Sequence, residues 1–252
     1  MSPTKPTIVV FSGAFHPASC MDLLLGKLEQ AGFPAEAYSL RTVGNPDAVV
    51  NDDSQYMRSV IIPHLDEDKD VIFIMHSFAG FAGSAAMSNL SRKSRESRGE
   101  KGGIIGVVYL SAFVPSEGVS ALDMLGGNWA PWHEEDTGLI TPKDPFETFY
   151  KDWDEDLAAE MVKTLKGHSV KSMKSVASAI GWKEKDYDGR RAYIRCLEDN
   201  ALPLVAQDAF VGNSGVDWLV KSLPTSHSPF LSRPDETSKI IQQLADEFQS
   251  VN

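Results

Sequence analysis

Cysteine and long hydrophobic runs are both scarce in this sequence. Only two cysteines, Cys20 and Cys196, occur among the 252 residues, which is too few for a disulfide framework or a structural zinc cluster. We interpret both as reduced packing residues. The first apolar run covers residues 8–11, and it is far too short for a signal-peptide core or a membrane span. The sequence therefore predicts a cytoplasmic protein that does not enter a membrane.

Positive charge is also in short supply. Lys and Arg total 24 against 35 Asp and Glu, which gives a net charge of −11. A phosphate backbone or an anionic membrane surface repels such a chain as a whole, so we expect neither nucleic acid nor a membrane as a partner. No His, Cys, Asp and Glu residues have metal-ligand spacing, and we expect no metal and no cofactor. The sequence leaves open whether the protein forms a homodimer.

Hydrophobic side chains suffice for one large core. They make up 42% of the chain and charged residues 23%, with no compositional sign of disorder. Short β-branched or aromatic runs recur with room for a helix between them, which is typical of a parallel sheet built from β-α-β units. The predicted strands are 7–11, 35–40, 70–75, 104–110, 192–197 and 216–223, and the predicted helices are 20–31, 52–65, 78–90 and 235–248.

The strand rhythm stops between residues 115 and 190. This segment is rich in Trp, Lys and Glu and in helix-forming runs such as 156–165 and 169–180. An insertion after a central strand lies over the crevice where open parallel sheets bind ligands. We therefore predict a core formed by residues 1–114 and 191–252 and a helical cap, or lid, at 115–190. An extra structural helical layer is the alternative.

The strongest local signal is a buried-type strand that turns at Ser77 into a helix lined with small residues. Glycine inside a helix costs roughly 0.8–1 kcal/mol relative to alanine, so Gly80 and Gly83 indicate a close approach of that helix to the sheet. A sharp strand-to-helix turn of this kind is the nucleophile elbow, which holds a serine in a strained conformation and exposes its hydroxyl. Met75 and Ala79 stand where the usual Gly-x-Ser-x-Gly pattern has glycine.

A serine at the start of a helix is, taken alone, more often an N-cap than a nucleophile. Its hydroxyl needs a neutral imidazole within reach and a carboxylate that sets the tautomer of that imidazole. In this arrangement the chain order is serine, acid, histidine, with the acid after a late strand and the histidine after the last. Asp199 and His227 follow the last two predicted strands. Glu198 is the rival acid, and we favour the shorter Asp199.

The loop after the first strand, residues 12–17, is built from small residues. A second donor for a developing oxyanion is expected there, and we predict the backbone N–H groups of Ala14 and Phe78 for this role. A plain strand-to-helix turn is the alternative interpretation. Aromatic side chains of the insertion suit an apolar or aromatic ligand, although packing against the core would explain them equally well. The predicted substrate contacts are Gly13, Phe15, His16, Trp129 and Trp132.

Taken together, these segments resemble the plant methylesterase and hydroxynitrile lyase family of α/β-hydrolases and the small fungal hydrolase-like proteins related to it. The resemblance covers nearly the whole chain, and it rests on residues 12–16, 76–80, 108–115, 198–203 and 226–227 with Pro234 downstream. It implies an α/β-hydrolase fold, a six-stranded, mainly parallel sheet flanked by helices with the inserted helical cap. It also implies Ser77 as nucleophile, Asp199 as acid and His227 as base.

The sequence departs from this family at several positions. Ser12 stands where the family commonly has His, Met75 where it commonly has Gly, and residues 125–187 are unlike the plant members. The resembling lyases have a lysine after the catalytic histidine and a threonine at the position of Gly13, whereas this chain has Ser228 and Gly13 there. We therefore expect a hydrolase and not a cyanohydrin lyase.

The predicted function is a serine hydrolase, a carboxylic-ester hydrolase with a Ser-His-Asp triad, that cleaves an ester or lactone of a small, apolar or aromatic organic molecule through an acyl-enzyme. Two alternatives stay open. A lyase or cyclase could use the same serine and histidine for proton transfer on a small secondary-metabolite-like substrate, and a ligand receptor could keep the pocket with a vestigial triad. The partner in each case is a small molecule.

Overall fold

A parallel sheet of six strands in the order β2-β1-β3-β4-β8-β9 forms the centre of the molecule. The computed structural model describes residues 5–251. The strands are β1 (Thr7–Phe11), β2 (Ala35–Tyr38), β3 (Asp70–His76), β4 (Gly103–Leu110), β8 (Arg191–Cys196) and β9 (Leu219–Leu223). Each neighbouring pair is parallel. The prediction of a six-stranded, mainly parallel sheet is confirmed.

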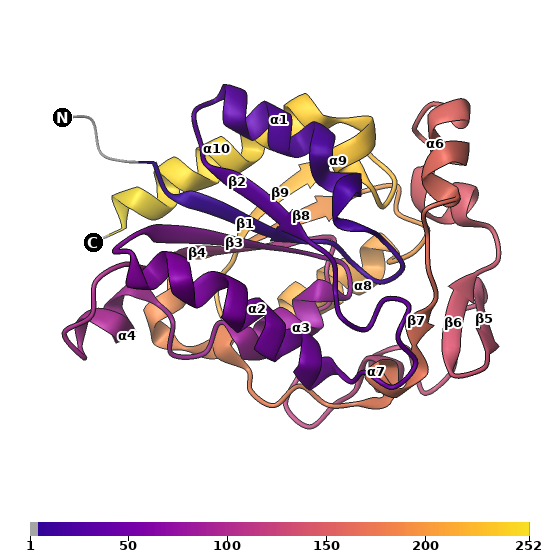
Figure 1. Cartoon of the computed structure of the whole chain (residues 1–252), viewed down its shortest axis with the longest axis horizontal. Helices are drawn as coiled ribbons and strands as arrows, with labels where there is room; N and C mark the ends of the chain where they lie inside the picture. The colour runs from indigo at the N-terminus through magenta and orange to yellow at the C-terminus, as the bar shows by residue number, and fades with distance from the viewer. Residues whose placement is uncertain (1–4, 252) are drawn as a thin grey trace.

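Helices cover both faces of this sheet (Figure 1). The helices α1 (Asp22–Gln30) and α10 (Pro234–Ser250) lie on one face, and α2 (Val50–Asp66) and α3 (Ala79–Ala86) lie on the other. Strands buried on both faces are continuous apolar runs, and β3 and β4 fit this description. The core also contains η1 (Ala18–Met21), α4 (Arg92–Glu96), α8 (Leu204–Gly212) and α9 (Pro229–Ser232). Within residues 5–251, no helix is long and apolar enough to cross a membrane.

The order of the strands decides where a site can form. Chain order reverses at β1, because β2 lies on one side of it and β3 and all later strands lie on the other. Open parallel sheets bind ligands beyond the carboxyl ends of their strands at such a switch point. The loops that leave β1 at Ser12 and β3 at Ser77 are neighbours at this point, since Phe11 pairs with Met75.

Residues 115–190 form an insertion that contains α5 (Ala121–Met124), β5 (His133–Asp136), β6 (Leu139–Pro142), η2 (Phe146–Tyr150), α6 (Glu155–Val162), β7 (His168–Ser169), α7 (Val170–Lys174), η3 (Gly181–Lys183) and η4 (Lys185–Tyr187). The part that contains β5, β6, β7 and α6 lies beyond the carboxyl ends of the strands (Figure 1), whereas the last residues of the insertion return along α4 to the start of β4. The prediction of a helical insertion was incomplete, because β5, β6 and β7 form an antiparallel sheet. Thr137 and Gly138 both have positive φ, 48° and 83°, as a two-residue hairpin turn requires.

Met75, the residue that departs from the usual glycine of the elbow, packs against a glycine of α3. A Cβ atom added to Gly83 would lie 2.2 Å from Met75 Sδ, which is closer than two atoms can pack. The thioether therefore fills the space that a side chain at position 83 would take, and Met75 is fully buried. The large residue in the strand is accommodated by the small one in the helix.

This packing predicts a strong energetic coupling between the two positions. Gly83→Ala should destabilise the protein by about 1–3 kcal/mol through overpacking, and Met75→Ala by about 2–5 kcal/mol through the cavity it leaves. The loss of unfolding free energy in the double variant should be smaller than the sum of the two single losses by about 0.5–3 kcal/mol. The reason is that the alanine methyl at position 83 enters the cavity left at position 75. Urea unfolding of all four proteins measures the coupling.

Gly26→Ala in α1 is the matched control, because a Cβ atom there meets nothing within 4 Å. It should leave the stability unchanged or raise it by up to about 1 kcal/mol. Strict additivity of Gly83→Ala and Met75→Ala would show that these side chains do not compete for one space.

Candidate active site

Ser77 occupies the sharp turn between β3 and α3. Its φ is 55°, in the left-handed region that a residue with a Cβ atom enters only at a cost of about 1–3 kcal/mol. Its backbone is held by two neighbours, because the Ser77 N–H donates to the Leu110 carbonyl at 3.3 Å and the Ser77 carbonyl accepts from Phe113 N–H at 3.1 Å. The turn has the geometry of a nucleophile elbow.

Glycine next to the elbow makes room for it. A Cβ atom on Gly13 would lie 2.7 Å from the Cβ of Ser77, and one on Gly80 would lie 2.4 Å from the carbonyl oxygen of Phe113. The loop after β1 and the segment after β4 therefore approach the serine more closely than any larger residue would permit. Gly13 lies behind Ser77 and does not line the cavity.

The Asp199 carboxylate and the His227 imidazole form a buried pair. His227 Nδ1 lies 2.6 Å from Asp199 Oδ2, and Ser111 Oγ donates to the same oxygen at 2.5 Å. The other oxygen, Oδ1, accepts the backbone N–H groups of Ala201 and Leu202, both at 2.8 Å. Both carboxylate oxygens therefore have hydrogen-bond partners. A proton on Nδ1 then leaves Nε2 of a neutral His227 as an acceptor.

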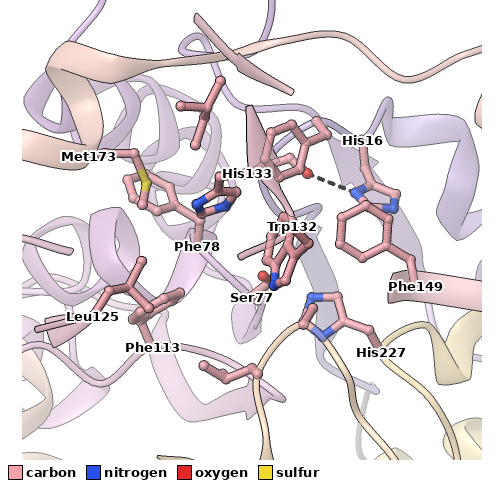
Figure 2. Close-up of a pocket in the computed structure, with 15 residues that line it drawn as sticks. His16, Ser77, Phe78, Phe113, Leu125, Trp132, His133, Phe149, Met173 and His227 are labelled. Atoms are coloured by element: carbon pink, nitrogen blue, oxygen red, sulfur yellow. Dashed lines mark hydrogen bonds between the residues drawn. The ribbon is translucent and has the colours of Figure 1, made fainter. Parts of the chain in front are cut away.

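Glu198, the other candidate for the acid, does not contact His227. Glu198 is exposed, whereas Asp199 is buried, and it is Asp199 that contacts His227. Ser77 and His227 both line one cavity (Figure 2). No hydrogen bond joins the Ser77 hydroxyl to His227 within the part of the chain that is described, and in ligand-free sites such bonds are often long and tighten only when substrate binds.

His227 is also held through its own backbone and its neighbour. His76 Nε2 lies 3.0 Å from the His227 carbonyl oxygen, so this nitrogen carries the proton and donates. Ser226 Oγ donates to the Asp152 carboxylate and lies 2.9 Å from the carbonyl oxygen of Phe149. The loop that carries His227 is thus tied to β3 on one side and to the insertion on the other.

His16 connects the loop after β1 to the insertion. Its Nδ1 donates to the Ala14 carbonyl oxygen at 2.7 Å, and its Nε2 accepts from the Tyr150 hydroxyl at 2.7 Å. The peptide unit between Ala14 and Phe15 is therefore held in one orientation. Within residues 5–251, the backbone N–H groups of Ala14 and Phe78 have no hydrogen-bond acceptor. Both residues line the cavity beside Ser77.

The cavity between core and insertion is narrow and mostly apolar. About 30 Å³ is open to the centres of water molecules, which is room for roughly two of them. Around Ser77, His227, His16 and His133, its walls consist of Ala14, Phe15, Phe78, Phe113, Leu125, Trp132, Ile140, Phe149, Met173, Ala201 and Leu202. Within residues 5–251, no three His, Cys, Asp or Glu side chains are grouped to hold a metal ion.

Of the predicted substrate contacts, Phe15, His16 and Trp132 line this cavity, and Gly13 and Trp129 do not. The Trp129 indole N–H donates to Glu135 at 2.7 Å, and its ring lies 5.6 Å from the Lys174 ammonium. Trp129 is a partly exposed residue on the outside of the insertion.

Sequence reasoning assigned no role to Ser111 or His133. Ser111 directly follows the apolar run of β4, and that position at the carboxyl end of a central strand was an available signal. Tyr150 was among the insertion aromatics expected to suit a ligand, but its hydrogen bond to His16 was not predicted. The places of Tyr150 and His133 depend on how the insertion folds.

A parallel sheet of this strand order, with a serine in a left-handed turn and an Asp–His pair at its carboxyl edge, defines the class of α/β-hydrolases. The profile of the alpha/beta hydrolase family matches residues 8–240, and the chain belongs to this family. The probable hydrolase R7 of Phoma sp. is 29% identical over 254 residues, which cover 96% of this chain and 99% of that protein.

The predicted resemblance to plant methylesterases is confirmed. The putative chloroplastic methylesterase 11 of Arabidopsis thaliana is 26% identical over 262 residues, which cover 96% of this chain and 64% of that protein. Two solved structures share the fold. A pyrethroid hydrolase from Sphingobium faniae has a TM-score of 0.74 at 19% identity, with 96% and 97% of the two chains covered. Polyneuridine aldehyde esterase has a TM-score of 0.74 at 22% identity, with 96% and 100% covered.

The close approach of Gly13 predicts that Gly13→Ala disables the serine. The added methyl would press on the Cβ of Ser77, and a displacement of about 1 Å at a reacting group costs about 100-fold in rate. We expect the rate of Ser77 labelling by a fluorophosphonate to fall by about this factor in the folded protein, and the overpacking to lower the stability by about 1–3 kcal/mol. Gly212→Ala, where the methyl meets nothing within 4 Å, should label normally. Equal labelling of both variants would contradict the steric argument.

Four buried histidines make the stability of the fold depend on pH. Burial lowers the pKa of His16 and of His133 to about 4 and that of His168 to about 3. Burial likewise holds the pKa of His76 well below its ordinary value. The unfolded chain binds protons on these side chains near pH 6.5. Their contribution to stability is therefore complete above about pH 6.5 and is lost as the pH falls toward 4.

Urea unfolding between pH 7.5 and 4.5 tests this dependence. Burial raises the pKa of Asp53 to about 6. Unfolding near pH 5.5 therefore releases about one proton from Asp53, which offsets part of the proton uptake by the histidines. We expect roughly two to three net protons to be taken up on unfolding near pH 5.5, each worth about 1.4 kcal/mol per pH unit. His168→Phe should remove about one proton from the slope. A free energy of unfolding that stays constant from pH 7 to pH 5 would contradict the burial of neutral imidazoles.

Proposed function

We propose that this protein is a serine esterase that cleaves an ester or lactone of a small, apolar or aromatic molecule through an acyl-enzyme. The observation that carries the proposal is the combination, in one cavity, of a serine at φ 55° with a histidine whose Nδ1 is bonded to a buried carboxylate. The names of hydrolases and esterases among the similar proteins support the same activity.

The reaction begins when His227 Nε2 accepts the proton of the Ser77 hydroxyl as its oxygen attacks the ester carbonyl carbon. The carbonyl oxygen becomes an oxyanion, and the N–H groups of Ala14 and Phe78 donate to it. The ester C–O bond then breaks, and the alcohol leaves with the proton from His227. A water molecule, deprotonated by His227, releases the acid and restores the serine hydroxyl. Asp199 stays ionised and stabilises the imidazolium.

The insertion at 115–190 serves in this proposal as a cap. It supplies much of the apolar wall, and through η2 and Asp152 it contacts both loops that carry the chemistry. Removing water from the site strengthens the interactions with the oxyanion. The apolar walls favour neutral substrates, whose burial costs little.

One contact favours hydrolysis over cyanohydrin cleavage. Ser12 is the hydroxyl nearest in sequence to the position where the resembling lyases have threonine. Its Oγ donates to the carbonyl oxygen of His16 at 3.0 Å and lies 3.3 Å from that of Tyr38, and Ser12 is fully buried outside the cavity lining. Neither Ser12 nor Gly13 therefore presents a hydroxyl to a ligand.

The triad assignment predicts that Ser77→Ala and His227→Ala each lower kcat for short naphthyl or p-nitrophenyl esters by up to about 10⁶-fold, because the residues act as a unit. Asp199→Asn should cost about 10⁴-fold, because it favours the wrong tautomer of the imidazole. Purified variants are compared in initial-rate assays, and fluorophosphonate labelling with peptide mapping identifies the nucleophile.

Glu198→Gln is the matched control for the acid, since Glu198 is the exposed neighbour of Asp199. It should keep nearly full activity. Retention of more than about a tenth of the wild-type rate in Ser77→Ala would remove that serine from the mechanism, and damage from Glu198→Gln in place of Asp199→Asn would refute the acid assignment.

A further inference from the structure

His133, the first residue of β5, brings a polar group into the apolar part of the cavity. It is buried and lines the cavity on the side of the insertion, near Phe78 (Figure 2). Its ring packs on Trp132 with a centroid separation of 4.0 Å. The other walls on this side are hydrocarbon, for example Leu125 and Met173. An imidazole in such surroundings needs a polar partner.

The hydrogen-bonding state of His133 follows from its backbone neighbour. The N–H of Ala130 donates to His133 Nδ1 at 3.3 Å. An imidazole nitrogen that accepts carries no hydrogen, so in the neutral ring the proton is on Nε2. Nε2 has no hydrogen-bond partner within residues 5–251, and the His133 side chain lines the cavity. His133 is therefore a neutral donor without an acceptor.

A second imidazole lies near His133 but does not line the cavity. His168 is fully buried, and neither of its ring nitrogens has a hydrogen-bond partner within the described residues. It packs edge-on against Phe78 at 4.4 Å. His168 and His133 both contact Phe15, with centroid separations of 6.0 and 6.2 Å. Of these two imidazoles, His133 is therefore the one that a ligand in the cavity can reach.

The other polar groups of the cavity are already engaged. Ser77 and His227 are required for the chemistry, and both nitrogens of His16 have partners. No Lys or Arg is among the lining residues, so a carboxylate would be buried without a counter-charge. The remaining partner for His133 Nε2 is a neutral oxygen acceptor on the ligand.

We propose that His133 is a specificity-determining residue that donates its Nε2–H to a ketone, ether or second ester oxygen on the substrate, remote from the bond that is cleaved. The substrate class is then an apolar or aromatic ester that carries one neutral oxygen acceptor along its chain. This inference rests on the proposed esterase function, because it concerns the same cavity.

The test compares methyl esters of ω-phenylalkanoic acids that carry a ketone at one of carbons 3 to 7 with their methylene parents. For at least one ketone position, wild-type protein should prefer the keto ester in kcat/KM by about tenfold. His133→Phe should abolish this preference, and His133→Gln, which retains an N–H donor, should keep part of it. The ratio of the kcat/KM values for the two esters does not depend on the fraction of folded protein. A variant that folds poorly can therefore still be compared with the wild type.

Two outcomes would overturn the proposal. The first is an equal loss on keto and methylene esters in His133→Phe, which would indicate packing alone. The second is the absence of any keto preference in the wild type. Binding of the same ester pairs to the Ser77→Ala protein, measured by calorimetry, provides an arm that does not depend on turnover. If no ester is hydrolysed, the proposed function fails, and this binding arm still decides whether His133 recognises the ketone oxygen.

Discussion

The left-handed backbone of Ser77 is the constraint on which the rest of the site depends. A serine at φ 55° persists only where the surroundings permit no other conformation. Here β3 enters the turn, α3 leaves it at once, and glycines 13 and 80 let two further segments approach within van der Waals contact. The oxyanion donors and the imidazole acquire their positions relative to this turn. Gly13 in the loop after β1 and Gly80 in α3 are therefore required by the geometry of the elbow, although glycine would otherwise destabilise a helix.

A short part of the insertion completes the site from the other side. The segment from Phe149 to Asp152 contacts His16 through the Tyr150 hydroxyl and contacts Ser226 through a carbonyl oxygen and a carboxylate. One of these contacts holds the His16 ring in the loop after β1, and the other holds the loop of His227. The insertion therefore does more than cover the cavity, because it positions groups of the core that would take part in the chemistry.

The fold was largely predictable because the central strands β1, β3 and β4 are buried apolar runs with turn residues at their ends. The approximate places of Ser77, Asp199 and His227 were predictable because each follows a predicted strand, and parallel strands bring their carboxyl ends to one edge. The insertion was not. Its strand β5 is acidic and largely exposed, so no alternation of apolar residues marks it. Whether Trp129 or Trp132 faces the cavity depends on that hairpin, and no local pattern separates two tryptophans three positions apart.

The bond between Tyr150 and His16 joins the insertion to the loop after β1. The cavity admits roughly two water molecules, so under the proposed function a larger substrate binds only if the walls of the cavity shift. A shift of η2 away from the core would break this bond and release His16 from the insertion.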